Sequence, residues 1–140
     1  MLLTLDAERY VNALQNLSED NLSQFLTLLD EDVHFKDPFN EGQGTDYFHH
    51  AMIDMYEKLD DVRFDVFEQC YADGTLVMHW VYSAKQKTLG EFSFKGVSWV
   101  KFNDEGKVTH HSDYWDSAEL MQRIPLLGAA VRYFKRQAAI

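Results

Sequence analysis

The chain has 140 residues, enough for one folded domain, and 46% are hydrophobic, which excludes an intrinsically disordered chain. Its net charge of −10 argues against nucleic acid as a partner, because such binding depends on neutralising phosphates with Lys and Arg. A single cysteine excludes an intrachain disulfide and a thiolate metal cluster. The sequence has no signal-peptide pattern and no apolar run of about 18 residues, which together predict a cytoplasmic protein.

The first 59 residues have mainly helical patterning. Apolar residues at helical spacing predict helices over residues 5–17 and 19–29. Alternation then predicts a short strand over residues 33–37, which ends before a proline. A loop at residues 40–44 leads into a third predicted helix over residues 45–59.

From Asp61 the hydrophobic period changes to two, which predicts an antiparallel meander. One strand starts at Val62 and ends before the turn Ala72-Asp73-Gly74, which is typical of a hairpin. Three more strands are predicted over residues 75–86, 91–102 and 107–116. Helices followed by a meander favour a single α+β domain over residues 1–140, with a basic amphipathic helix at 117–137 that Pro125 breaks or kinks.

Short segments along the chain have a familiar order and spacing: Arg9-Tyr10-Val11 with Ala13-Leu14, Lys36-Asp37-Pro38-Phe39, Gly44-Thr45, Phe102-Asn103, Gly106-Lys107-Val108 and Tyr114-Trp115. Through them the chain, to about Leu120, resembles the NTF2-like superfamily, in its SnoaL-like polyketide cyclase and ketosteroid isomerase-like branches. The resemblance implies a cone-shaped (cystatin-like) α+β fold with three N-terminal helices on a curved antiparallel sheet. The C-terminal helix is then an addition. The resemblance also implies a dimer with a hydrophobic pocket.

The resemblance also implies roles for individual residues. The isomerase's general-base aspartate corresponds to Asp37, and its phenolic oxyanion donor to Tyr10. Its second donor is a protonated aspartate, for which this chain has Ser98; a hydroxyl is the weaker donor, which argues against ketosteroid isomerisation itself. SnoaL-like cyclases have an acid on the last long strand, where this chain has Asp113.

Strand alternation predicts which side chains meet. If Trp115 points inward, Asp113 and His111 do so too, and the resemblance places His79 inside as well. We therefore expect Asp37, Asp113, His79 and His111 as catalytic residues in an apolar cavity. Tyr10, Ser98 and Trp115 are the expected substrate-binding residues.

Structural interpretations of the same residues remain open. Asp37 can instead hydrogen-bond the backbone of a turn before Pro38. An Asp–His pair can serve only to fix the sheet, and Tyr10 and Ser98 can simply pack in the core. A metal site formed by His79, His111 and Asp113 is a further alternative, although no close-spaced ligand motif supports it. We expect no metal and no cofactor.

These residues predict a SnoaL-like enzyme that applies aspartate acid–base chemistry to a small apolar or lipid-like molecule, as an isomerase, cyclase, dehydratase or epoxide hydrolase. A non-catalytic, dimeric module that binds a small hydrophobic ligand is the alternative, and a structural adaptor is a third. Aromatic residues expected on the outer face of the sheet predict a homodimer: Trp80, Tyr82, Trp99 and Tyr114.

The tail has a charge pattern of its own. After Glu119 the chain has four bases and no acid, among apolar residues at helical spacing. This pattern predicts peripheral contact with a membrane surface or an acidic partner. The alternative is a helix that closes the cone or packs on the sheet, with its bases offsetting the acidic body and the helix dipole.

Overall fold

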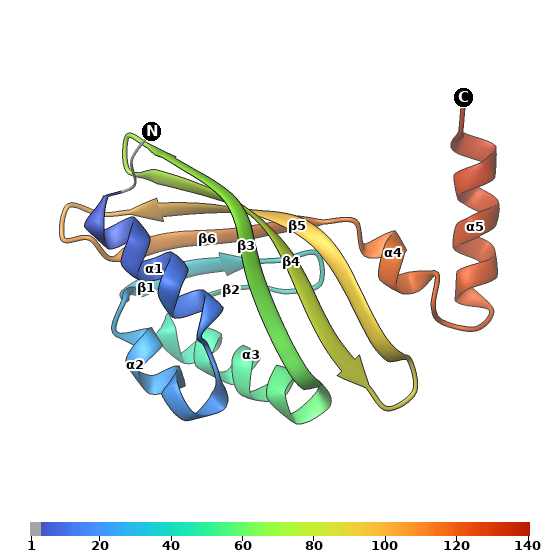
Figure 1. Cartoon of the computed structure of the whole chain (residues 1–140), viewed down its shortest axis with the longest axis horizontal. Coiled ribbons are helices and arrows are strands. Elements are labelled where there is room, and N and C mark those ends of the chain that lie inside the picture. Colours follow the sequence, from blue (N-terminus) through green and yellow to red (C-terminus); the bar gives the residue numbers. More distant parts are fainter. Residues whose placement is uncertain (1–3) are drawn as a thin grey trace.

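The computed structural model describes residues 4–140, and its first layer is helical (Figure 1). Helix α1 (Leu5–Gln15) begins at Thr4, whose Oγ1 accepts a hydrogen bond from the Ala7 N–H at 3.2 Å. The face that α1 buries carries residues at helical spacing, Ala7, Tyr10, Val11 and Leu14. The helical layer also contains the 3-10 turn η1 (Glu19–Asn21) and the helices α2 (Leu22–Leu26) and α3 (Thr45–Lys58).

Six strands form one mixed sheet, in the order β2-β1-β6-β5-β4-β3. Neighbouring strands are antiparallel except β1 and β6, which are parallel. At the β3–β4 turn Asp73 and Gly74 both have positive φ, as the predicted hairpin requires. The strand bounds are β1 (Leu29–Lys36), β2 (Glu41–Gln43), β3 (Asp60–Ala72), β4 (Thr75–Gln86), β5 (Gly90–Phe102) and β6 (Val108–Trp115).

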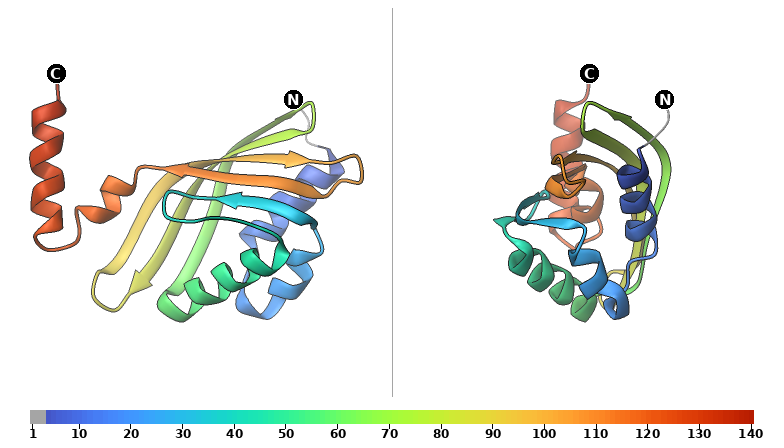
Figure 2. Two further views of the ribbon diagram at one scale, coloured as in Figure 1. Left: turned by 180° about the vertical axis from the view of Figure 1, so that it is seen from behind. Right: turned by 90° about the vertical axis from the view of Figure 1, so that its left-hand side faces the viewer.

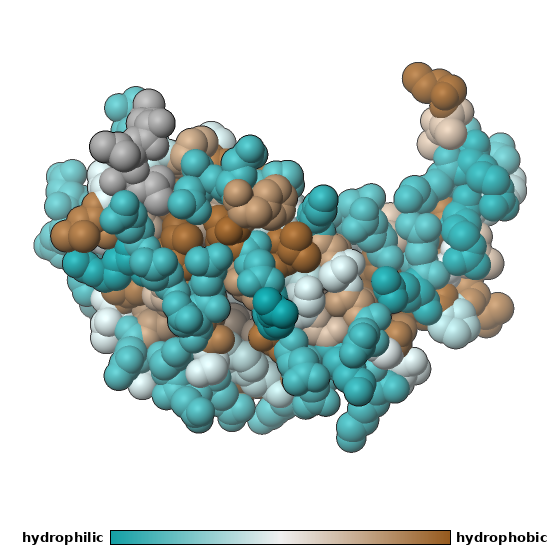
Figure 3. Space-filling view, in the orientation of Figure 1, coloured by the Kyte–Doolittle hydropathy of each residue, from teal (hydrophilic) through white to brown (hydrophobic). Residues whose placement is uncertain are grey.

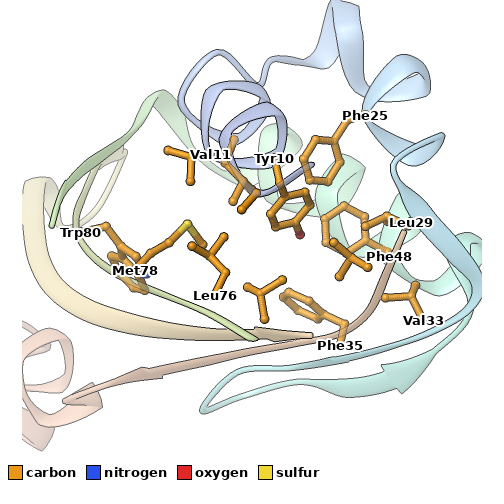
Figure 4. Close-up of a cluster of buried hydrophobic side chains, with 14 of the residues drawn as sticks. Tyr10, Val11, Phe25, Leu29, Val33, Phe35, Phe48, Leu76, Met78 and Trp80 are labelled. Atoms are coloured by element: carbon orange, nitrogen blue, oxygen red, sulfur yellow. The ribbon is translucent and has the colours of Figure 1, made fainter. Parts of the chain in front are cut away.

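The sheet curves around the three N-terminal helices, as the two further views show (Figure 2). Side chains from α1, α2, α3 and the inner face of the sheet fill the space between the layers. Tyr10 reaches from α1 into the middle of this cluster (Figure 4). Labelled core residues around it include Val11, Phe25, Leu29, Val33, Phe35, Phe48, Leu76, Met78 and Trp80.

The predicted α+β cone is confirmed, but several elements differ, and the sheet predicted to be antiparallel is mixed because β1 pairs with β6 in parallel. The helix predicted over residues 19–29 is the 3-10 turn η1 followed by α2, and Leu29 already belongs to β1. Leu29 pairs with Val108 of β6, so its burial comes from the sheet, although its spacing from Leu26 and Phe25 also fits a helix. The predicted loop at residues 40–44 contains the short edge strand β2.

The inward and outward faces of β4 are the reverse of the prediction. Leu76, Met78 and Trp80 point into the core, whereas His79 lies on the outer face. Large side chains occupy both faces of β4, so alternation alone cannot say which face is buried. The prediction that His79 points into the cone is therefore wrong, as is the prediction of Trp80 and Tyr82 on the outer surface.

The C-terminal segment forms two helices where one broken helix was predicted. Helix α4 (Ser117–Met121) begins at Asp116, whose Oδ1 accepts from the Ala118 N–H at 3.0 Å. Helix α5 (Leu127–Ala138) follows a sharp corner and stands away from the body of the cone (Figures 1 and 2). None of the helices in residues 4–140 is both long enough and apolar enough to cross a bilayer.

Candidate functional site

Five polar side chains meet inside the cone and come from α1 and three adjacent strands. His111 and Asp113 are two residues apart on β6, so they share its inner face. Ser98 of β5 pairs with Asp113 in the sheet, and Trp80 lies on the neighbouring strand β4. Tyr10 approaches from α1. The fold thus brings together residues separated by as many as 103 positions in the sequence.

These side chains form one continuous hydrogen-bonded chain, which we call the Asp113 network. The indole N–H of Trp80 donates to Ser98 Oγ at 2.8 Å, and the Ser98 hydroxyl donates to Asp113 Oδ1. His111 Nε2 lies 2.7 Å from the same Oδ1, and Tyr10 Oη lies 2.7 Å from His111 Nδ1. Both hydrogen-bond paths therefore end on a single carboxylate oxygen.

The Tyr10 phenol is held in its protonated form. Burial raises the pKa of the phenol well above its usual value, and the negative charge of Asp113 raises it further. The phenol is therefore available as a hydrogen-bond donor to His111 Nδ1. With the phenol as donor, the His111 tautomer with its proton on Nε2 donates to Asp113, and each of these groups then has a partner.

Asp113 is the member of the network that is open to other molecules. Its side chain is 18% exposed, against 4% for that of His111. Oδ2 of Asp113 has no hydrogen-bond partner within residues 4–140, and no fully buried side-chain oxygen or nitrogen in that range is unpartnered. Oδ2 is therefore accessible while Oδ1 is held, so the carboxylate has one oxygen free to take or return a proton.

An aromatic wall continues from Asp113 along the inner face of the sheet. Trp115 stacks on Phe94, with ring centroids 4.1 Å apart, and the Phe39 ring meets the other side of Trp115 at 5.3 Å. Phe94 in turn stacks on Tyr82 at 5.1 Å. Such a surface suits an apolar molecule better than a charged one.

Asp37 shares no hydrogen bond with the network, and it lies in the turn after β1, one residue beyond Lys36, which pairs with Ser112 of β6. Its Oδ1 accepts from the backbone N–H groups of Phe39 and Asn40, both at 2.7 Å. These are the contacts of a turn aspartate. The charge of Asp37 still acts on Tyr82 in the aromatic wall. Burial raises the pKa of Tyr82, and the neighbouring Tyr56 and Asp37 raise it further.

His79 is the predicted site residue that the structure places elsewhere. Its ring lies 4.3 Å from that of Phe67 on the outer face, with Nδ1 3.8 Å from Glu68 Oε1. The alternative metal site of His79, His111 and Asp113 is contradicted by this placement. Among residues 4–140 no three His, Cys, Asp or Glu side chains are arranged to hold a metal ion.

The structure adds Trp80 to the candidate site. A buried indole needs an acceptor for its N–H, and Ser98 provides one on the adjacent strand. Gly96 leaves room for the Trp80 ring, because a Cβ at that position would collide with it. Gly96, which occupies an inward-facing position of β5 where apolar residues otherwise dominate, was the available sequence signal for close approach by another group.

A separate open cleft of about 360 Å³ lies near the far end of the β4–β5 hairpin. Its lining is largely polar and includes none of the residues of the Asp113 network. The lining residues are Asp61, Ser83, Ala84, Lys85, Glu91, Phe92, Ser93 and Arg123.

Helices held inside a curved six-stranded sheet are the arrangement of the NTF2-like fold, which solved structures share. An NTF2-like protein of unknown function from Burkholderia pseudomallei superimposes with a TM-score of 0.76 at 17% identity, over 87% of this chain and 99% of that one. A candidate SnoaL-like polyketide cyclase from Shewanella putrefaciens gives 0.73 at 17% identity, over 87% and 97%. An LEH-like epoxide hydrolase from M. tuberculosis gives 0.70 at 16% identity, over 98% and 97%.

The sequence itself identifies the family. Residues 7–111 match the model of the SnoaL-like domain, so the chain belongs to the SnoaL-like family. No curated protein matches the chain significantly. The matched segment contains Tyr10, Ser98 and His111 and ends two residues before Asp113.

Proposed function

We propose that the protein is a cofactor-independent acid–base enzyme acting on a small apolar or lipid-like molecule, as an isomerase, cyclase or hydrolase. The observation that carries the proposal is the asymmetry of Asp113. Two donors hold Oδ1, whereas Oδ2 is accessible beside an aromatic wall. A carboxylate held in this way can exchange a proton with a bound molecule without first having to reorient.

In the proposed reaction Asp113 Oδ2 takes a proton from an activated C–H or O–H group of the substrate, or from a water that attacks it. The same oxygen then returns the proton to the product. The His111 N–H and the Ser98 hydroxyl stabilise the carboxylate form of Asp113, which is present before the proton is taken and after it is returned. Tyr10 and Trp80 are positioning residues, because they act on Asp113 only through His111 and Ser98.

The structural neighbours support a catalytic interpretation. One is a candidate polyketide cyclase and another an epoxide hydrolase, so proteins with this fold include enzymes of small organic molecules. Neither is more than 17% identical to this chain, and the substrate class is therefore inferred from the aromatic wall.

The test uses two families of probe, hydrophobic epoxides and hydrophobic ketones. Product chromatography follows epoxide hydration, and NMR in D₂O follows exchange of the protons next to the ketone. We expect Asp113→Asn to lower the rate of the active probe by about 10²–10⁴-fold, the usual contribution of a general base. Asp104→Asn, in the exposed β5–β6 turn, is the matched control and should leave the rate unchanged. An active protein that tolerates Asp113→Asn would refute the proposed role.

A non-catalytic ligand-binding module is the second candidate, favoured by one observation. Apart from Asp113 Oδ2, every hydrogen-bonding group from Trp80 to Tyr10 has a partner within residues 4–140, as in a purely structural network. Such a module would bind apolar probes without converting them. In that case Asp113→Asn would leave the Kd of the probe within about threefold, since charge would matter little to an apolar ligand.

A further inference from the structure

Helix α5 presents an apolar face that is only partly covered within residues 4–140, since Val131 is half-buried while Leu127 and Phe134 are exposed. Leu127, Val131, Phe134 and Ala138 follow one another at helical spacing and so share one side of the helix. Phe134 is 71% exposed, and Gly128 is the one residue of α5 that is buried. Leaving this face in water forgoes the favourable free energy that burial of its apolar area would provide.

The helix is held at its first turn. Arg132 donates to the Gln122 carbonyl at 3.0 Å, and a Cβ on Gly128 would collide with the same carbonyl oxygen. Arg123 donates to the Glu91 carbonyl at 3.1 Å and ties the α4 segment to β5. The corner is thus fixed to the cone, while the helix beyond it projects into solvent (Figure 2).

The charges of α5 are the opposite of those of the body. Arg132 and Arg136 lie on the side of the helix away from its apolar face, Lys135 flanks that face, and α5 has no acid. The space-filling view shows hydrophilic side chains along the helix, with apolar groups at its corner and at the C-terminal end (Figure 3). All 23 acids of the chain precede residue 120.

Two kinds of acidic surface could receive this helix, and its geometry favours one. On the acidic body of a second copy the bases would face that body, and the apolar face would then point into water. On an anionic bilayer the apolar face enters the boundary between headgroups and acyl chains, while Lys and Arg extend back to the phosphates. A bilayer accommodates both faces of the helix at once.

We propose that α5 is a membrane-docking arm that binds anionic lipid surfaces, with Leu127, Val131 and Phe134 inserted and Lys135 and Arg136 at the headgroups. The projection of the helix allows this despite the acidic body. At physiological ionic strength the screening length is about 8 Å, so acidic groups farther from the bilayer are only weakly repelled.

The test is co-sedimentation of the full-length protein with vesicles of phosphatidylcholine alone and of phosphatidylcholine with about 30% phosphatidylglycerol. We expect binding to the anionic vesicles at low salt and loss of most of it at 0.5 M NaCl. Lys135→Gln with Arg136→Gln should weaken binding about 30-fold, since each base near an anionic surface contributes about fivefold. Phe134→Ser should weaken it too, by removing an inserted ring.

The matched control is Lys87→Gln with Lys101→Gln, which removes the same charge from exposed sites on the body. The inference is wrong if this control weakens binding as much as the α5 variant, or if neutral and anionic vesicles bind equally. It is also wrong if the wild type forms larger assemblies without lipid that the α5 variant dissolves, because α5 would then dock on a second copy. Phe134, Lys135 and Arg136 are exposed, so none of these variants threatens folding.

Discussion

At the scale of single residues, the candidate site is a carboxylate whose two oxygens have different surroundings. Asp113 Oδ1 receives two hydrogen bonds, and the donors of both are themselves fixed by a further partner, Trp80 or Tyr10. Substituting an outer member should therefore act on Asp113 indirectly. Tyr10 is the most informative of these residues, because it joins the helical layer to the sheet.

We predict that Tyr10→Phe lowers the free energy of unfolding at pH 7 by about 1–3 kcal/mol. The reason is that His111 Nδ1 would be left buried without a donor. Urea unfolding followed by circular dichroism measures the change. Tyr133→Phe, an exposed tyrosine of α5, is the control and should change stability by less than about 0.5 kcal/mol. Equal effects of the two substitutions would mean that the Tyr10–His111 bond contributes no net stability.

Part of this site could be predicted from the sequence, for a definite reason. Strand β6 has one large apolar anchor, Trp115, and counting back in steps of two from it gives Asp113 and His111 on the inner face, as observed. Strand β4 has no such anchor, since His79 and Trp80 are both plausible inner residues. Which of them is buried depends on the partner that Ser98 offers across the sheet.

At the scale of elements, the outer face of the sheet carries an exposed aromatic surface. Trp99 and Tyr114 are 47% and 57% exposed there, and Phe67 lies beside His79 on the same face. Large aromatic side chains gathered on one surface are typical of a protein–protein interface. We propose that two copies of the chain associate through this face, without Trp80, which is buried in the core.

Trp99→Glu tests the proposed dimer. We expect wild-type protein to be dimeric at micromolar concentration, and the variant to dissociate at least about 30-fold more readily, because a central interface aromatic contributes about 2 kcal/mol. Sedimentation velocity gives both association constants. Tyr133→Glu makes the same kind of change on α5, which is outside this face, and should leave the dimer intact. A wild-type monomer, or a dimer insensitive to Trp99→Glu, would exclude this interface.

Element boundaries were hardest to predict where one residue satisfied two patterns. Leu29 continues the helical spacing of Leu26 and Phe25, yet it is buried by pairing with Val108, far along the chain. Likewise Pro125 predicted a break in the last helix. The corner geometry depends on Leu126, which has a φ of 69°, and on the contact of Gly128 with the Gln122 carbonyl. Tertiary contacts of this kind leave no local signal.

At the scale of the whole molecule, the ionisation of tyrosines with raised pKa values makes the stability of the fold depend on pH in the alkaline range. Burial raises the pKa of Tyr10 and of Tyr82, and it raises that of Tyr56 to about 12. In the unfolded chain tyrosines ionise near pH 10. Above that pH the unfolded state loses protons that the folded state retains, so folding becomes less favourable as pH rises.

We therefore predict a fall in the free energy of unfolding between pH 9 and pH 11, and a smaller fall in Tyr10→Phe than in the wild type. Urea unfolding at the two pH values measures both, and the difference between the proteins removes the contribution of lysines that titrate in the same range. A fall of the same size in both proteins would show that Tyr10 ionises as easily in the folded state as in the unfolded chain.

The parallel pairing of β1 with β6 has a consequence for how the molecule forms. Strands β3 to β6 are joined by short turns, so they can pair early from local encounters. The Tyr10–His111 bond spans 101 positions and can form only after that meander closes onto the first strand and helix. On a ribosome, β6 is the last strand to emerge. Tyr10 is therefore the last member to join the Asp113 network, and chains that stop at the meander expose the inner face of the sheet with Ser98, His111 and Asp113 already on it.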